Sequence, residues 1–247
     1  MTSIENTSSV HTTKSSQPED FDVAILGGGT GSTIAAWTFA SEGRRVAVVD
    51  HKHIGGSCPN IACLPSKNII HSARVASYVR KSREFGIEVD GFKLDMSGVR
   101  HRKRGMVLGL NQMCLENYRA TGAELIFGTG RFIASKTIEV NLRDGGARQL
   151  RGTNVIISTG THATVPPIPG LAEVQPLTHI ETLELDRVPE HLLVLGGGYV
   201  GAELSQAMRR FGINVTILDT NDRCHGKTRM YALLFAAYLK TKALKSF

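Results

Sequence analysis

The sequence predicts an α/β fold in which one strand–turn–helix–strand unit occurs twice. Residues 25–50 read ILGGGTGSTIAAWTFASEGRRVAVVD and residues 194–219 read VLGGGYVGAELSQAMRRFGINVTILD, so equivalent positions lie 169 residues apart (194 − 25) without a gap. In each copy a short apolar run, typical of a buried strand, leads into three glycines, and a helical stretch follows. A repeat at a fixed offset indicates two copies of one structural unit.

The first copy predicts where the ordered chain begins. Residues 1–20 are rich in Ser and Thr and are expected to form a flexible tail, so order should begin at Phe21. Three elements are expected next: a strand before Gly27, a helix over residues 32–42 that stops at Gly43, and a strand over residues 45–50.

The segment between the copies predicts helices and then a small β segment. Residues 65–120 are polar, basic and helical in character, residues 123–142 are β-rich, and residues 154–159 form another apolar run. Three prolines and a glycine within residues 166–170 then mark a linker. We therefore expect a tail over residues 1–20, a first domain over residues 21–165 and a partial second domain over residues 166–247.

Length and composition exclude several classes of protein. The chain has 247 residues, of which 41% are hydrophobic and 21% charged, and its 26 glycines follow no collagen period. No run approaches the roughly 18 apolar residues of a membrane span. The first 20 residues lack the basic-then-apolar pattern of a secretory signal. We expect a cytoplasmic protein that binds neither membranes nor nucleic acid.

The net charge of +7 comes from 29 basic and 22 acidic residues and could attract anions. The basic residues are scattered, and the densest cluster comprises Arg100, Arg102, Lys103 and Arg104. Because no aromatic residues are interleaved there, the cluster favours a solvated face over a nucleic-acid patch.

Each glycine turn is suited to hold a pyrophosphate. A buried strand enters the turn, and the helix that follows points its free N–H groups at it. Gly27 and Gly196 allow the tight turn, and Gly29 and Gly198 let the backbone approach the phosphate. Each copy is therefore predicted to be a Rossmann-like dinucleotide-binding unit.

Two further positions complete the pattern in each copy. Gly201 allows close packing of helix and strand, whereas the first copy has the larger Ser32 there and matches the fingerprint less fully. Asp50 and Asp219 end the second strands, where a carboxylate can accept hydrogen bonds from an adenosine ribose. A turn that served packing alone would not account for these acids.

Asp219 also bears on cofactor choice. A carboxylate repels the 2′-phosphate of NADP, and no arginine follows at once, since Arg223 comes only after three other residues. NAD is therefore the favoured cofactor, and NADP stays the alternative because of Arg223.

Cys58 and Cys63 form a close pair beside the first site. Cytosolic proteins do not normally keep structural disulfides, so the pair suggests redox chemistry, a metal site with His51, His53 or His71, or an inert pair. The C-x4-C spacing is loose for zinc, and no second cysteine pair follows. Redox chemistry is favoured because Cys63 precedes a helical run expected near Ser66, which favours a thiolate. Cys114 is expected at a buried apolar position and Cys224 at the surface.

These motifs resemble the N-terminal half of the class I pyridine nucleotide–disulfide oxidoreductases, the flavin-dependent family that includes dihydrolipoamide dehydrogenase, glutathione reductase and mercuric reductase. The family pattern is GxGxxG for FAD, an acid after the second strand, GG[TS]CxNxGCxP[ST]K, an ATG, and a second GGGxxGxE. This chain shows each motif in order. Ala62 departs from the pattern by replacing a glycine, and residues 158–160 read STG in place of ATG.

The resemblance implies a role for each matching residue. Cys63 would be the charge-transfer thiol beside the flavin, and Cys58 the interchange thiol that meets the substrate. Lys67 would lie near flavin N5 and pair with Glu203, and Tyr199 would cover the nicotinamide pocket. Taken alone, Glu203 would be interpreted as a first-turn acid that complements the helix dipole, and Tyr199 as a surface aromatic.

The implied fold is a Rossmann-like FAD-binding domain, with a mixed, mainly parallel sheet and a small β segment, followed by an incomplete Rossmann-like NAD(P)-binding unit. The implied FAD contacts are Gly27, Gly29, Thr30, Gly31, Ser32, Asp50, Ser57, Lys67, Thr129, Gly130, Thr159 and Gly160. The implied NAD(P) contacts are Gly196, Gly198, Tyr199, Val200, Gly201 and Asp219.

The implied activity is transfer of hydride from NAD(P)H to FAD and of electrons from FAD to the Cys58–Cys63 disulfide, with Cys58 then attacking an oxidised acceptor. A small-molecule disulfide, a metal ion or a quinone is compatible. The family forms homodimers through a domain that follows the second copy, and residues after Arg223 do not resemble the family. The alternative expectation is a truncated or frameshifted, non-catalytic remnant of such an enzyme.

Overall fold

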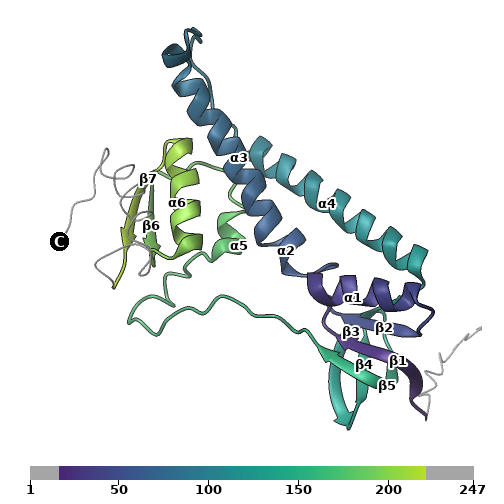
Figure 1. Ribbon diagram of the computed structural model, residues 1–247. Helices are drawn as coiled ribbons and strands as arrows, with labels where there is room; N and C mark the ends of the chain where they lie inside the picture. Colours follow the sequence, from purple (N-terminus) through teal and green to yellow (C-terminus); the bar gives the residue numbers. More distant parts are fainter. Residues whose placement is uncertain (1–16, 221–247) are drawn as a thin grey trace, which may run out of the picture. The chain divides into compact units, whose positions relative to one another are not determined.

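The computed structural model describes residues 17–220, and the chain divides into two compact units (Figure 1). The first unit draws on Met1–Asn60 and Gly109–His162, and the second on Ile61–Leu108 and Ala163–Phe247. The chain therefore passes between the units three times. Residues 1–16 of the expected tail, together with Arg223, Cys224 and the segment that follows, lie outside the described residues.

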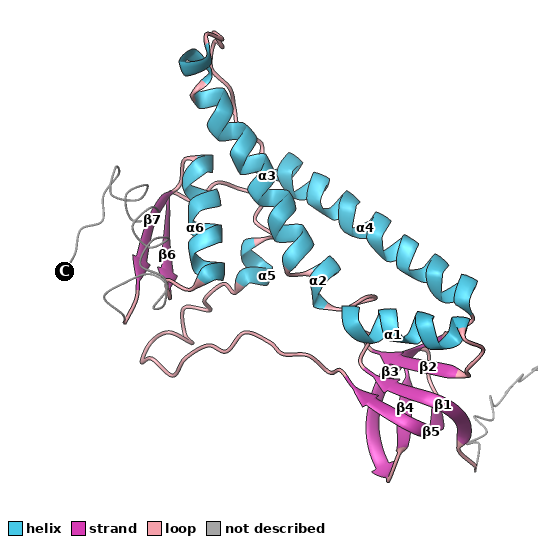
Figure 2. Ribbon diagram, in the orientation of Figure 1, coloured by secondary structure: helices cyan, strands magenta, loops and turns pink. Residues whose placement is uncertain are grey.

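The first unit is a five-stranded sheet closed into a ring (Figure 2). Its strands are β1 (Glu19–Leu26), β2 (Val46–Asp50), β3 (Glu124–Ala134), β4 (Thr137–Leu142) and β5 (Ala147–Ile157). β1 pairs in parallel with β2 and β5, and β2 with β3, whereas β4 pairs antiparallel with β3 and β5. The predicted mixed, mainly parallel sheet is confirmed, and β1 begins two residues before Phe21.

The ring closes because β3 and β5 are long enough to serve two partners. Residues 124–127 of β3 pair with β2, and residues 128–134 pair with β4. β5 is likewise shared between β4 and β1. The parallel sheet and the small β segment expected from the sequence are thus one continuous hydrogen-bonded structure.

Strand alternation gives the first unit two apolar clusters. In β1, Ala24 belongs to one cluster while Val23 and Ile25 belong to the other, since successive side chains point to opposite faces. The first cluster takes residues from all five strands and fills the ring. The second packs β1 and β2 against α1 (Thr30–Ser41) and against Cys114 and Tyr118 of α4 (Met96–Thr121).

The second unit packs helices against a two-stranded parallel sheet. Its elements are α3 (Cys63–Arg80), the 3-10 helix η1 (Ser82–Phe85), the first half of α4, α5 (His179–Thr182), β6 (His191–Leu195), α6 (Tyr199–Phe211) and β7 (Asn214–Leu218). β6, α6 and β7 form the predicted second strand–turn–helix–strand copy. The residues that α3 contributes to the core, Ile69, Ala73 and Ala76, recur at helical spacing. They share one cluster with Ala207, Met208 and Phe211 of α6.

The basic cluster of α4 is held by partners within the second unit. Lys103, only 1% exposed, is paired with Glu184, and Arg104 contacts the same carboxylate. Arg100 is paired with Asp186 at 2.9 Å, and Arg102 donates to Asn68 Oδ1 at 2.7 Å. The expectation of a solvated face is therefore wrong for Lys103, because acids about 80 positions away in the sequence meet this helix. No helix within residues 17–220 is both long and apolar enough to cross a membrane.

Candidate functional site

β1 ends in a turn whose first residue must be glycine. Gly27 has φ +100°, and a Cβ there would lie 2.1 Å from Ser158 O. Gly29 follows as the N-cap of α1, with no capping side chain and no acidic residue in the first turn of the helix. The N–H groups at the start of α1 are therefore available to an anion.

Asp50, at the end of β2, binds the backbone of this turn. Its Oδ2 accepts a hydrogen bond from Gly28 N at 2.8 Å, and its Oδ1 accepts from the N–H groups of Lys52 and His53 at 2.8 and 3.1 Å. These bonds fix the carboxylate beside the glycine turn. Burial and the neighbouring Lys52 lower the pKa of His53, which disfavours the charged form of this imidazole beside the turn.

Two other predicted segments pack against the same turn. Thr30 Oγ1 donates to Gly55 O at 3.1 Å, and a Cβ on Gly56 would lie 2.5 Å from Gly29 Cα, so the backbone leading to Ser57 lies on the start of α1. Ser158 N donates to Leu26 O at 2.7 Å, which places Thr159 and Gly160 directly after this contact.

Thr129 and Gly130 lie in β3, where packing explains the glycine. A Cβ on Gly130 would lie 2.5 Å from Leu26 Cδ1 and 3.4 Å from Val49 Cγ1. Gly130 therefore allows the ring to close beneath the ends of β1 and β2. Thr129 is exposed and paired with Asn141 of β4.

The second turn repeats the geometry of the first. Gly196 has φ +101°, and Gly198 is an uncapped N-cap residue with extended backbone, as Gly29 is. Gly197 N donates to Asp219 Oδ2 at 2.5 Å, as Gly28 N does to Asp50. A Cβ on Gly201 would lie 2.2 Å from Gly196 O. The sequence repeat is thus also a repeat of backbone and hydrogen bonds.

The two cysteines of the motif lie at the starts of helices. Cys58 is the half-buried second residue of α2 (Ser57–Asn60), and the exposed Cys63 is the first residue of α3. α3 thus begins three residues before the expected start near Ser66. The sulfur of Cys63 belongs to the first helical turn, where free backbone N–H groups gather. Cys58 belongs to the first unit and Cys63 to the second.

The second unit joins Lys67 to Glu203. Lys67 Nζ and Glu203 Oε2 form an ion pair between α3 and α6, with both side chains about half exposed. Glu203 is the fifth residue of α6, so it is not the first-turn acid of the alternative interpretation. Tyr199 begins the same helix and is 69% exposed, next to Val200.

Comparison with known proteins places these features in a family. The family model described as pyridine nucleotide-disulphide oxidoreductase matches residues 21–244. The chain belongs to this family. It is 34% identical over 212 residues to dihydrolipoamide dehydrogenase of Chaetomium thermophilum and 36% identical over 202 residues to mercuric reductase of Streptomyces lividans, covering 84% and 80% of this chain.

A solved structure supports the same family assignment. The HOCl-induced flavoprotein disulfide reductase RclA of Escherichia coli has a TM-score of 0.77 and 28% identity, covering 90% of this chain and 47% of that one. The chain spans 42% of the length of each of the two relatives named above.

Pyridine nucleotide–disulfide oxidoreductases are FAD-dependent, and the first unit fits that cofactor. The start of α1 is uncapped, Asp50 is held beside the turn, and nothing lies within 4 Å of a Cβ built on Gly31. These features offer hydrogen bonds, a ribose acceptor and room to a dinucleotide. Gly196 and Gly198 in the second unit also have nothing within 4 Å, which leaves space at the second turn.

The structure distributes the predicted site residues between the units. The first unit brings together the turn residues Gly27, Gly29, Thr30, Gly31 and Ser32 with Asp50, Ser57, Thr159 and Gly160. The second holds Cys63, Lys67 and Glu203, and it gathers Gly196, Gly198, Gly201 and Asp219 around the other turn.

Three residues outside the predicted set support the first site. Gly28 supplies the N–H that Asp50 accepts, and Gly56 allows close contact with Gly29. Asn60 Nδ2 donates to Ile54 O at 2.7 Å and to Gly56 O at 2.8 Å, which holds the loop before Cys58. The sequence signal for these residues was their place inside the motifs, between residues already assigned to chemistry.

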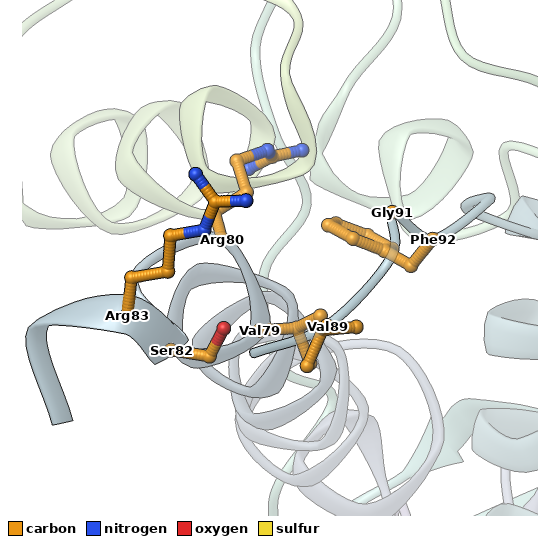
Figure 3. A pocket seen from close by; sticks show the side chains of 7 residues that line it. All are labelled: Val79, Arg80, Ser82, Arg83, Val89, Gly91 and Phe92. Atoms are coloured by element: carbon orange, nitrogen blue, oxygen red, sulfur yellow. The ribbon is translucent and has the colours of Figure 1, made fainter. Parts of the chain in front are cut away.

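Other groups lie apart from this chemistry. Within residues 17–220, no three His, Cys, Asp or Glu side chains gather closely enough to hold a metal ion. Cys114 is buried as expected, and burial raises its pKa to about 11. A pocket of the second unit is lined by Val79, Arg80, Ser82, Arg83, Val89, Gly91 and Phe92, none of them a predicted site residue (Figure 3).

Proposed function

We propose that this chain supplies the FAD site, the NAD(P)H site and the redox-active cysteine pair of an NAD(P)H-dependent disulfide or metal-ion oxidoreductase. The observation that carries the proposal is the doubled turn. Two uncapped helix starts, each with an acid bonded to the middle glycine, match two dinucleotides. The cysteine motif between them supplies the acceptor.

Bound FAD supplies the two-electron chemistry that links a nicotinamide dinucleotide to a disulfide. The residues of this chain bind and orient the two dinucleotides. Asp50 and Asp219 accept hydrogen bonds from ribose hydroxyls, and the two helix starts hold pyrophosphates. The Cys58–Cys63 disulfide takes up two electrons and two protons to give two thiols. The two thiols then give the two electrons and two protons to the oxidised substrate, which Cys58 meets, and the Cys58–Cys63 disulfide forms again.

Lys67 and Glu203 are proposed to act together. An ammonium paired with a carboxylate is held in one direction, which suits a lysine that must sit close to an electron-accepting ring. Tyr199, exposed at the start of α6, is proposed to cover the nicotinamide pocket and to move aside when the dinucleotide binds.

The proposed substrate is a small-molecule disulfide or a metal ion. Relatives named dihydrolipoyl dehydrogenase and mercuric reductase support these two classes. Location in the cytoplasm is part of the same proposal.

Replacing each cysteine by serine tests the roles of the pair. Cys63→Ser should abolish the long-wavelength charge-transfer absorption of the two-electron-reduced, FAD-loaded protein, because the thiol beside the flavin is gone. Cys58→Ser prevents disulfide formation and leaves the sulfur of Cys63 reduced and free to donate charge to the flavin, so the band should be present before reduction. Absorption spectra recorded during anaerobic NADH titration measure both.

An unchanged spectrum in Cys63→Ser would overturn the assignment of that thiol. Purified wild-type protein that is colourless and takes up no FAD would overturn the proposed function itself.

NADH is proposed as the preferred donor, because the carboxylate of Asp219 accepts ribose hydroxyls and repels a 2′-phosphate. Asp219→Asn should raise the KM for NADH and narrow the NADH over NADPH preference by about tenfold, the effect of about 1.4 kcal/mol. Steady-state kinetics with both donors measure this ratio. Asp50→Asn is the matched variant in the first copy and should leave the ratio unchanged.

A further inference from the structure

The two glycine turns differ in how their carbonyl groups are held. In the first copy Ser32 stands at the third glycine position, and its Oγ lies 2.8 Å from Gly27 O and 2.9 Å from Gly29 O. Its one hydroxyl proton is therefore shared between two carbonyls of the turn. At the equivalent Gly201 a Cβ would lie 2.2 Å from Gly196 O, so the second turn has no room for such a side chain.

The next residue holds the remaining carbonyl. Thr33 is 2% exposed, and its Oγ1 donates to Gly28 O at 3.1 Å. The same oxygen accepts a hydrogen bond from Tyr118 OH at 3.1 Å. Its counterpart in the second copy, 169 positions later, is Ala202, which has no hydroxyl.

Tyr118 anchors this chain of hydrogen bonds in the core of the first unit. It is 4% exposed and packs edge to face on Trp37, with ring centroids 5.6 Å apart. Burial raises the pKa of Tyr118 to about 12, so the phenol remains a donor at all ordinary pH values. The order of donation runs from Tyr118 to Thr33 to Gly28 O, and Gly28 N in turn donates to Asp50.

We infer that Ser32, Thr33 and Tyr118 are positioning residues that hold the first turn in its dinucleotide-binding conformation before the ligand arrives. The hydroxyl groups of Ser32 and Thr33 bind the carbonyls of Gly27, Gly28 and Gly29, which leaves the N–H groups at the start of α1 for phosphate. A site formed in advance loses less entropy on binding and binds more tightly.

The difference between the turns suits two cofactors used differently, and this step rests on the proposed function. FAD has to stay bound through many cycles, whereas the nicotinamide dinucleotide has to leave after each one. The first turn, with three hydroxyl groups behind it, serves the retained cofactor. The second, with Gly201 and Ala202 at the matching positions, serves the exchanging one.

Residue-resolved hydrogen exchange of the full chain without cofactor tests the inference directly. Gly28 N and Gly197 N make the same bond to equivalent acids, so their exchange rates compare the two turns. The amide of Gly28 should exchange at least about fivefold more slowly than that of Gly197, which is the effect of about one extra hydrogen bond. Equal rates in the wild type would overturn the inference.

Variants that copy the second turn into the first sharpen the test. Ser32→Gly with Thr33→Ala installs the residues found at positions 201 and 202 and should bring Gly28 to the rate of Gly197. Thr33→Ser keeps the hydroxyl and should retain the slow rate. Tyr118→Phe keeps the contact with Trp37 and should accelerate exchange at Gly28 by about threefold, less than the loss of a bond to the turn itself, since the hydrogen bond it removes is made to Thr33.

Amide exchange in β4, away from the turn, reports whether each variant remains folded. If the double variant unfolds, Thr33→Ser and Tyr118→Phe decide the question. A Gly28 rate unchanged in a folded double variant, or in Tyr118→Phe, would contradict the proposal.

FAD titration separates this inference from the proposed function. The double variant should bind FAD about tenfold more weakly than the wild type, measured by quenching of flavin fluorescence. Equal FAD affinity would contradict the inference while leaving FAD binding intact. No FAD binding by the wild type would contradict the proposed function, and the exchange rates of Gly28 and Gly197 would still decide whether the first turn is held.

Discussion

At the scale of single residues, Lys103 shows how a sequence pattern can mislead. It lies in a run of basic residues that reads as a solvated face, yet it is 1% exposed. An ammonium group can be buried only with a partner, and Glu184 provides it. Burial opposes ionisation of Glu184, but hydrogen bonds from Lys103 and Arg104 outweigh it, so the pKa of Glu184 is lowered.

Removing this carboxylate should destabilise the fold markedly. Glu184→Gln leaves the buried ammonium of Lys103 without an opposite charge, and the free energy of unfolding should fall by about 2–3 kcal/mol, less than for a fully buried pair because Glu184 is 39% exposed. Urea unfolding with an unchanged slope measures the loss. Glu84→Gln, which removes the exposed pair with Lys81, should cost less than about 0.5 kcal/mol. Equal losses in the two variants would contradict the role given to Glu184.

At the scale of elements, one arginine joins three strands of the ring. Arg148 of β5 binds Glu19 of β1 and Glu124 of β3, each at 2.6 Å. The hydrogen bond from Arg148 lowers the pKa of Glu19. In the second unit, Arg80 of α3 similarly donates to the carbonyls of Arg210 and Phe211 at the end of α6 and lies over the Phe92 ring.

The lowered pKa of Glu19 predicts a pH dependence of stability. A carboxyl group whose pKa is depressed by folding stabilises the fold above its ordinary pKa of 4.5, and the contribution is lost as the pH falls through the lower folded value. Glu19→Gln should therefore be less stable than the wild type at neutral pH and lose less stability between about pH 5 and 3. Urea midpoints across this range measure the difference.

The control for this prediction is Glu88→Gln. Glu88 is exposed and has no ion-pair partner among residues 17–220, so its variant should follow the wild-type pH profile. A profile of Glu19→Gln that coincides with the wild type would show that Arg148 does not stabilise the ring through this pair.

At the scale of the whole molecule, the chain forms two compact units with separate apolar cores. One core is built from strands and α1, the other mainly from α3 and α6. Each unit carries one of the two repeated turns, so each proposed dinucleotide site depends on a different core.

Separate cores predict unfolding in two steps. Trp37 is the only tryptophan and lies in the first unit, so its fluorescence follows that unit, while far-UV circular dichroism follows both. The two denaturation curves should not coincide, and FAD should shift the midpoint of the fluorescence curve to a higher denaturant concentration. Coincident curves at all denaturant concentrations would show that the units unfold as one.

The repeat explains why much of the fold and site could be predicted. Glycines with positive φ, such as Gly27 and Gly196, and acids at the end of the second strand are local requirements of the turn, and local requirements are visible in sequence. The start of α3 at Cys63 was missed because helix starts depend on the loop that enters them. Burial of Lys103 was missed because its partner lies 81 positions away.

The sequence by itself determined the α/β class, the two glycine turns, their acids and the family, because these depend on short-range backbone geometry and side-chain chemistry. Tertiary structure alone decided that the sheet closes into a ring, that Glu184 neutralises a buried lysine, and that Tyr118 reaches Thr33 behind the first turn. The physical reason is that these contacts join residues far apart in the chain, and only packing brings them within hydrogen-bond distance.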